Sequence, residues 1–280
     1  MSADVMIAVL FGALLHAIWN ALVRGSPDRT LSTVLVAASA GAIAACWLPF
    51  APLPASQSWP YLAASVVIHI VYFALVAFSY RKGELSFVYP IMRGMAPVLS
   101  AIVAALLLSE WPSLWGWLGV LLVCSGVILL AADSLRARTF HTSSALFALA
   151  NAGVIVVYTL VDGVGARLSG HPLSYTGWML LLTAVPLLAI SMDRHGANTI
   201  RYMQHHWARG LIGGVCTFGS YGLALWAMTR APIALVAAMR ETSVVFAMIL
   251  AATFLRERIT SARIVSVLVV TAGAVAIKVS

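Results

Sequence analysis

The chain has 280 residues, of which 62% are hydrophobic and only 9% are charged. A soluble domain carries about 25% charged residues, so this chain has too little polar surface to cover a globule in water. The composition therefore predicts an integral membrane protein with about ten spans, which leave no room for a soluble catalytic domain of ordinary size.

Continuous apolar runs, without the alternation that a β-barrel requires, predict closed helices across the bilayer. In chain order the expected spans are 4–24, 30–50, 60–80, 86–108, 113–132, 143–165, 172–192, 207–229, 232–255 and 260–279. Gly, Pro, Ser and charged residues separate them. The predicted fold class is an all-α polytopic membrane protein with ten transmembrane helices.

The net charge of +8 comes from basic residues scattered over short joins, so nucleic acid is not an expected partner. The odd-numbered joins hold Arg24, Arg29, Arg81, Lys82, Arg136, Arg138, Arg194, Arg201, Arg209, Arg256, Arg258 and Arg263, whereas the even-numbered joins and the termini hold Arg167, Arg230 and Lys278. The positive-inside rule then places the odd joins in the cytoplasm and both termini outside. The membrane we expect is a bacterial inner membrane.

An internal repeat appears when the chain is shifted by 147 residues, because 12 of 35 pairs are then identical over 92–126 and 239–273. The polar matches are Arg93 with Arg240, Glu110 with Glu257, and Ser113 with Thr260; Gly126 also matches Gly273. The predicted halves are 1–135 and 143–280, with five spans each, so the second half must be inverted. Inverted repeats are typical of alternating-access transporters.

Three segments carry a family resemblance: Trp19-Asn20, 86–129 and 236–277. They resemble the drug/metabolite transporter superfamily, of the ten-span EamA type, most closely in its helix–loop–helix signature. That signature reads Glu110-x2-Ser113-x5-Gly119 in the first half, and the second half has Ser266 in place of the glycine. The resemblance implies a transporter, not an enzyme, with spans 1, 3, 4, 6, 8 and 9 around a cavity and spans 5 and 10 at the rear.

Two arginines lie inside predicted spans, where a charge is costly and usually functional. We interpret Arg93 and Arg240 as a clamp for a carboxylate or phosphate-like group, which a guanidinium binds bidentately. The alternative is that each arginine is a buried partner of an internal acid or of helix carbonyls. Glu241 and Asp162 are such acids, and either is also a candidate for carrying a coupling proton.

Further polar and aromatic residues are predicted to bind substrate. Tyr89 shares a helical face with Arg93, Asn151 and Tyr158 share one with Asp162, and His16, Trp19, Asn20, His69 and Tyr221 come from other spans. For the histidines, the alternative is a hydrogen-bonded core position; for the aromatic residues, it is packing or the interfacial belt. Glu110, Glu257, Ser113 and Thr260 are predicted to be structural, capping and bracing their hairpins.

No metal or cofactor is predicted, because Cys46, Cys124 and Cys216 are isolated and show no ligand spacing. No nucleotide-binding motif is present, so ATP is not the expected energy source. The predicted function is a secondary transporter for a small anionic or zwitterionic metabolite, such as an amino acid, an organic acid or a phosphonate-like compound. It acts in the lipid bilayer as a monomer or homodimer. The alternatives are proton-coupled export of drugs or lipophilic cations and, with no motif in support, a membrane-embedded enzyme.

Overall fold

The computed structural model describes residues 1–81, 85–135, 142–254 and 260–280, and these residues form helices and no strands. The helices are α1 (Ala3–Arg24), α2 (Arg29–Trp47), α3 (Trp59–Arg81), α4 (Leu85–Leu108), α5 (Leu114–Leu135), α6 (Thr142–Leu168), α7 (Pro172–His195), α8 (Ala197–His205), α9 (Trp207–Met228), α10 (Ile233–Arg240), α11 (Ser243–Phe254) and α12 (Ser261–Val279). Two short 3₁₀ helices, η1 (Leu48–Phe50) and η2 (Ser56–Ser58), lie between α2 and α3.

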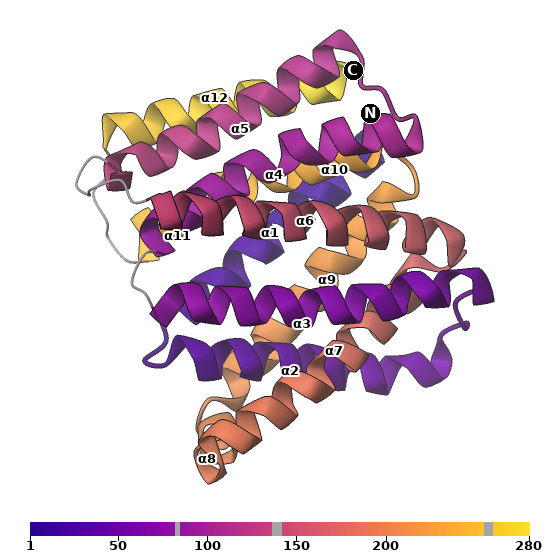
Figure 1. Ribbon diagram of the computed structural model, residues 1–280, viewed down its shortest axis with the longest axis vertical. Coiled ribbons are helices and arrows are strands. Elements are labelled where there is room, and N and C mark those ends of the chain that lie inside the picture. The colour runs from indigo at the N-terminus through magenta and orange to yellow at the C-terminus, as the bar shows by residue number, and fades with distance from the viewer. Residues whose placement is uncertain (82–84, 136–141, 255–259) are drawn as a thin grey trace.

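Within the described residues, seven helical segments are long and apolar enough to span a membrane: Ala3–Arg24, Arg29–Phe50, Leu149–Leu168, Pro172–His195, Trp207–Met228, Ile233–Leu250 and Ser261–Val279. Arg93–Leu108 and Leu114–Leu130 are shorter apolar helices. The long helices lie side by side (Figure 1). Large apolar side chains such as Leu107 and Leu268 are exposed on the outside. The prediction of an all-helical membrane protein is confirmed.

The expected span at 232–255 corresponds to the apolar segment Ile233–Leu250, but its helix is interrupted between Arg240 and Ser243, which was not predicted. At the break, Glu241 N–H donates to Ala238 C=O at 3.0 Å and Thr242 N–H donates to Met239 C=O at 3.1 Å. These are 3₁₀-type bonds, and the Thr242 hydroxyl also donates to Met239 C=O at 2.7 Å. A run of three buried polar side chains at 241–243 thus separates α10 from α11.

A second difference is α8, which lies in a join where no helix was predicted. It is a nine-residue amphipathic helix between α7 and α9. The hydroxyl groups of Tyr202 on α8 and Ser32 on α2 are 2.7 Å apart. The Thr199 hydroxyl donates to Ser191 C=O at 3.0 Å on α7. These bonds attach α8 to the ends of two long helices.

At one edge of the molecule α5 and α12 pack together through glycines (Figure 1). A Cβ atom on Gly119 would lie 2.8 Å from Gly273 O, and one on Gly126 would lie 2.9 Å from Ser266 O. The later residue of α5, Gly126, contacts the earlier residue of α12, Ser266, so the two helices are antiparallel. The repeat offset of 147 converts the first of these contacts into the second, as a two-fold axis through the pair requires.

The Ser266 position is the one where the second half departs from the family signature. Its side chain is buried, and its hydroxyl donates to Ala262 C=O of its own helix at 2.8 Å. The hydroxyl is thereby satisfied within α12, so a serine is accommodated opposite Gly126.

The remaining packing follows the same symmetry. The contact of α4 with α6 corresponds to the contact of α10 and α11 with α1. The contact of α3 with α6 corresponds to that of α9 with α1, and α2 packs on its own counterpart, α7. The termini lie close together, because the Met1 amino group donates to Lys278 C=O at 3.2 Å (Figure 1).

Candidate functional site

A small polar cavity lies where α4, α6 and α10 meet. Its lining residues are Arg93, Ala96, Pro97, Ser100, Ile155, Tyr158, Thr159, Ala237, Arg240 and Glu241. About 20 Å³ is open to the centres of water molecules. That is room for about one water and far less than a ligand pocket needs. The cavity is therefore almost closed in this conformation.

Arg93 on α4 forms an ion pair with Glu241, with 3.0 Å between Nη2 and Oε2. The two side chains are 12% and 7% exposed, so the pair is removed from bulk solvent. Glu241 reaches Arg93 because it lies at the break between α10 and α11, outside the regular helix. The structure thus gives Arg93 the internal acid that its alternative interpretation required.

Arg240 is placed differently, although it occupies the matching position of the repeat. Its guanidinium carbon lies 5.1 Å from the centre of the Tyr221 ring, a cation–π contact. Among the described residues it forms no ion pair, since the neighbouring Glu241 points to Arg93. The cavity lining therefore contains two guanidinium groups and one carboxylate.

Asp162 is fully buried next to this cavity and is held by two tyrosines. The Tyr175 hydroxyl on α7 donates to Oδ1 at 3.1 Å, and the Tyr221 hydroxyl on α9 donates to Oδ2. Gly165 makes room for this arrangement, because a Cβ atom there would lie 2.6 Å from the Tyr175 hydroxyl. Tyr221 accordingly links the carboxylate of Asp162 to the guanidinium of Arg240.

Tyr175 was missed by sequence reasoning. It lies between Ser174 and Thr176 with no charged neighbour, and the one available signal was that a buried Asp162 must find hydrogen-bond donors. A search of the next span for hydroxyl groups would have found it.

An aromatic cluster continues from the cavity. His69 on α3 lies 4.8 Å from Tyr158 and 5.9 Å from Tyr221 between ring centres, and Tyr72 lies 5.8 Å from Tyr158. His69 Nδ1 also lies 2.9 Å from Ser65 C=O of its own helix. The predicted residues His69, Tyr158 and Tyr221 are thus brought together beside the arginines.

The predicted residues of α1 do not line the cavity. The His16 and Trp19 rings contact each other edge to face at 5.1 Å, and the Asn20 side-chain amide donates to His16 C=O at 2.8 Å. Asn151 is buried in α6, outside the lining. Tyr89 belongs to α4, but its side chain lies outside the described residues.

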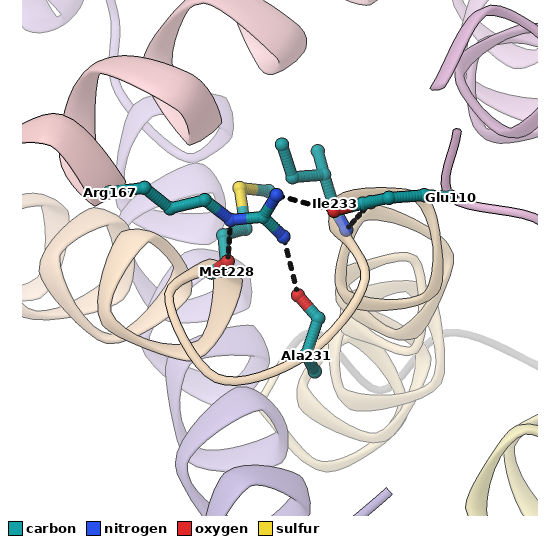
Figure 2. Close-up of polar contacts among 5 residues, drawn as sticks. All are labelled: Glu110, Arg167, Met228, Ala231 and Ile233. Atoms are coloured by element: carbon teal, nitrogen blue, oxygen red, sulfur yellow. Dashed lines mark hydrogen bonds and ion pairs between the residues drawn. The ribbon is translucent and has the colours of Figure 1, made fainter. Parts of the chain in front are cut away.

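Glu110 and Arg167 form a second polar cluster, shown in Figure 2, at the side of the protein where α6 ends. Their side chains form an ion pair, and Arg167 also donates to Met228 C=O at 2.7 Å and to Ala231 C=O at 3.0 Å. The second Glu110 oxygen accepts the Ile233 N–H at 2.9 Å. Glu110 therefore caps α10 of the other half rather than the helix that follows it in sequence.

The hydroxyl groups predicted to cap helices occupy equivalent places in the two halves. Ser113 Oγ accepts the Gly116 N–H at 3.1 Å at the start of α5, and Thr260 Oγ1 accepts the Arg263 N–H at 3.4 Å at the start of α12. Glu257 lies outside the described residues. Within the described part of the chain, no group of three or more His, Cys, Asp or Glu residues is placed to hold a metal ion.

These features define a multi-pass membrane protein with an interior polar cavity between two symmetrically packed sets of helices. The family model of the EamA-like transporter family matches residues 4–132 and 142–279. The chain therefore belongs to this family, part of the drug/metabolite transporter superfamily, and is a membrane transporter.

Two further comparisons complete the picture. No curated protein matches the chain. A solved structure titled "Crystal structure of protein" has a TM-score of 0.75 and 15% sequence identity, and the alignment covers 100% of this chain and 98% of that one. At this identity the likeness supports the fold alone.

Proposed function

We propose that the protein is a secondary transporter that moves a small anionic or zwitterionic metabolite by alternating access. Ten spans in two inverted halves of five form the transport path, and the substrate binds at the cavity between α4, α6 and α10. The antiparallel α5–α12 contact and the symmetric helix pairings support this arrangement.

The observation that carries the proposal is the unequal charge of the cavity. Arg93 forms an ion pair with Glu241, whereas Arg240 forms none among the described residues; its guanidinium lies over the Tyr221 ring and interacts with Glu241 beyond ion-pair distance. Arg240 is partly buried, and a cation withdrawn from water without a paired counter-ion is costly. An anionic group on the substrate compensates it, and the planar guanidinium fork suits a carboxylate or phosphate-like group.

The closed cavity supports alternating access rather than an open channel. With about 20 Å³ of free space, the described conformation admits water but not a metabolite. Helices must separate before substrate enters, and the break between α10 and α11 is a place where one span can bend. A zwitterionic substrate would place its amino group near Glu241 and the Tyr158 ring.

Export of lipophilic cations is the second candidate, and Glu241 is the acid that it requires. The ion pair with Arg93 already occupies that carboxylate, so the cavity favours an anion over a cation. Glu241 and Asp162 stay predicted as proton-coupling residues. The predicted placement of both termini outside the cytoplasm is also part of the proposal.

Flux into proteoliposomes tests the proposal, with labelled amino acids, organic acids and organic cations as separate substrates. Arg240→Ala should reduce flux of the preferred anion or zwitterion by at least about tenfold, the effect of losing one charge-assisted contact. Arg230→Ala is the matched control, because Arg230 also lies over an aromatic ring, at 4.7 Å from Trp226, but is exposed. Equal flux in both variants would contradict the proposal, as would transport of cations only.

A further inference from the structure

The helices around the cavity form two sets, each with members from both halves of the chain. In one set α3 and α4 pack on α6, and in the other α9, α10 and α11 pack on α1. The contacts of α10 with α4 and α6, and of α9 with α6, join the two sets. The cavity lies on this boundary, because its lining comes from α4 and α6 on one side and from α10 and the residue after it on the other. A metabolite therefore reaches the cavity when the two sets separate.

Glu110 and Arg167 make hydrogen bonds across this boundary (Figure 2). Arg167, in the last turn of α6, donates to Met228 C=O and Ala231 C=O, and Glu110, just after α4, accepts the Ile233 N–H. The turn between α9 and α10 thus meets a cation where α9 ends and an anion where α10 begins. These are the charges that the two helix dipoles favour, so the first set holds the turn of the second by complementary charge.

These bonds lie between the cavity and the surface on the side of the termini. The lining residue Thr159 precedes Arg167 by eight positions on α6, which is about 12 Å along the helix. Arg240 follows Ile233 by seven positions on α10, which is about 10 Å. Asp4, in the first turn of α1, interacts electrostatically with the turn between α9 and α10. The path from the cavity to this side of the membrane therefore passes the two charged residues.

The backbone fixes Glu110 to the set that contains α4. The Glu110 N–H donates to Ala104 C=O in the last turns of α4 at 3.3 Å. The residue between them and the helix end, Ser109, has a φ of 57° and is the non-glycine residue with positive φ in the described part of the chain. Such a conformation is costly for a serine and persists where the surrounding structure imposes it. Glu110 is thus expected to move with α4 and not as part of a free loop.

We infer that Glu110 and Arg167 form a gate, which closes the cavity on the side of the termini and releases the turn between α9 and α10 when this side opens. The inference rests on the alternating access of the proposed function. Both side chains belong to one helix set, so their ion pair stays intact when the sets separate, and neither charge loses its partner. The Arg167 side chain is 32% exposed, so water can replace the backbone groups that it releases.

Labelling of a cysteine in the cavity from each side of the membrane tests the gate. Thr159→Cys places a buried thiol in the lining, in a chain whose three native cysteines are replaced by alanine. The impermeant reagent sulfonatoethyl methanethiosulfonate is added to spheroplasts and to inverted vesicles. Arg167→Gln and Glu110→Ala should each raise the labelling rate from the side of the termini by about tenfold, because charge-assisted bonds of the closed state are lost. Arg230→Gln removes a charge from the same turn outside the gate and should leave the rates unchanged.

A distance measurement separates a gate from a permanent brace. Leu168 and Pro232 are exposed neighbours of the gate on the two helix sets, so both accept spin labels as cysteine variants. Double electron–electron resonance should show a short and a long distance between the labels. Arg167→Gln should raise the ratio of the long to the short population by about tenfold.

Three results would overturn the inference: unchanged labelling in both gate variants, an equal rise from both sides, or one fixed distance between the spin labels. Gly119→Ala strains the contact between α5 and α12 instead and should not change the labelling ratio of the two sides, which separates gating from lost stability. The labelling and the distances need no substrate. Absence of anion flux would therefore contradict the proposed substrate class and leave the gate standing.

Discussion

The carboxylate of Glu110, in the join between α4 and α5, accepts the backbone N–H of Ile233, the first residue of α10, at 2.9 Å. The preceding residue, Pro232, has no N–H, so Glu110 serves the first free donor of that helix. A carboxylate is favoured at a helix N-terminus by the unpaired N–H groups and by the helix dipole. One half of the protein thus caps a helix of the other half.

Glu110→Ala removes both the cap and the ion pair with Arg167, so it should lower the free energy of unfolding by about 2–4 kcal/mol. Glu110→Gln keeps an acceptor oxygen for Ile233 and should cost about half as much. Equilibrium unfolding in mixed micelles, followed by circular dichroism, measures both. If glutamine were as costly as alanine, the contact with Ile233 would contribute nothing.

The buried pair of Arg93 and Glu241 predicts strong coupling. Either single alanine substitution leaves one buried charge without its partner and should destabilise the protein by about 3–5 kcal/mol. The double variant removes both charges and should cost less than the sum of the single losses. A double-mutant cycle on the free energy of unfolding gives the coupling, and additive losses would argue against the ion pair.

Tyr221 has two separable contacts, a hydroxyl on Asp162 and a ring on Arg240. Tyr221→Phe loses only the hydrogen bond and should cost about 1–3 kcal/mol of stability. Tyr221→Leu also loses the cation–π contact, so its KM for the transported anion should be higher than that of Tyr221→Phe. Tyr175→Phe is the comparison, because it removes the other donor to Asp162 without touching Arg240. A KM effect of equal size in all three variants would contradict a role for the ring.

The contact between α5 and α12 depends on glycine. Gly119→Ala and Gly273→Ala each place a methyl group within 2.8 Å of backbone atoms of the facing helix, and each should destabilise the fold by about 1–3 kcal/mol or more. Gly153→Ala on α6 is the control, since nothing lies within 4 Å of the added atom. That change should be neutral or stabilise the helix by up to about 1 kcal/mol. Thermal unfolding in detergent compares the three.

The sidedness of the chain can be measured with reporters fused to the C-terminus. Lys278 lies beside Met1, so both termini are on one side. The distribution of arginine predicts that this side is outside the cytoplasm. An alkaline phosphatase fusion should therefore be active and a fluorescent-protein fusion dark, and the reverse pattern would overturn the charge argument.

Hydrophobic patterning predicted most helix positions well. The expected spans 172–192 and 260–279 correspond to Pro172–His195 and Ser261–Val279, because lipid requires long apolar helices and polar joins mark their ends. The helix break near Glu241 was not predicted, because helix propensity favours a continuous helix. The break is accompanied by local hydrogen bonds and by the ion pair of Glu241 with Arg93 of another span.

The site was only partly predictable for a similar reason. Buried arginines stand out in an apolar run, so Arg93 and Arg240 were found, and the repeat made them look equivalent. Their partners differ because of tertiary contacts between residues about 150 positions apart in the sequence. The match between the two halves of the repeat does not show these contacts. The same is true of Glu110, which was predicted to cap and brace its own hairpin but accepts the Ile233 N–H of the other half.

The bond between Met1 and Lys278 makes the chain almost a closed ring. A short linker could join the ends, and new ends could be opened between the two halves, so that translation begins at Thr142 in α6. With five spans in each half, as proposed, such a permuted chain would start on the opposite side of the membrane from the native one. If it still folded and transported, the order in which the two halves are synthesised would be immaterial, and each half would direct its own orientation.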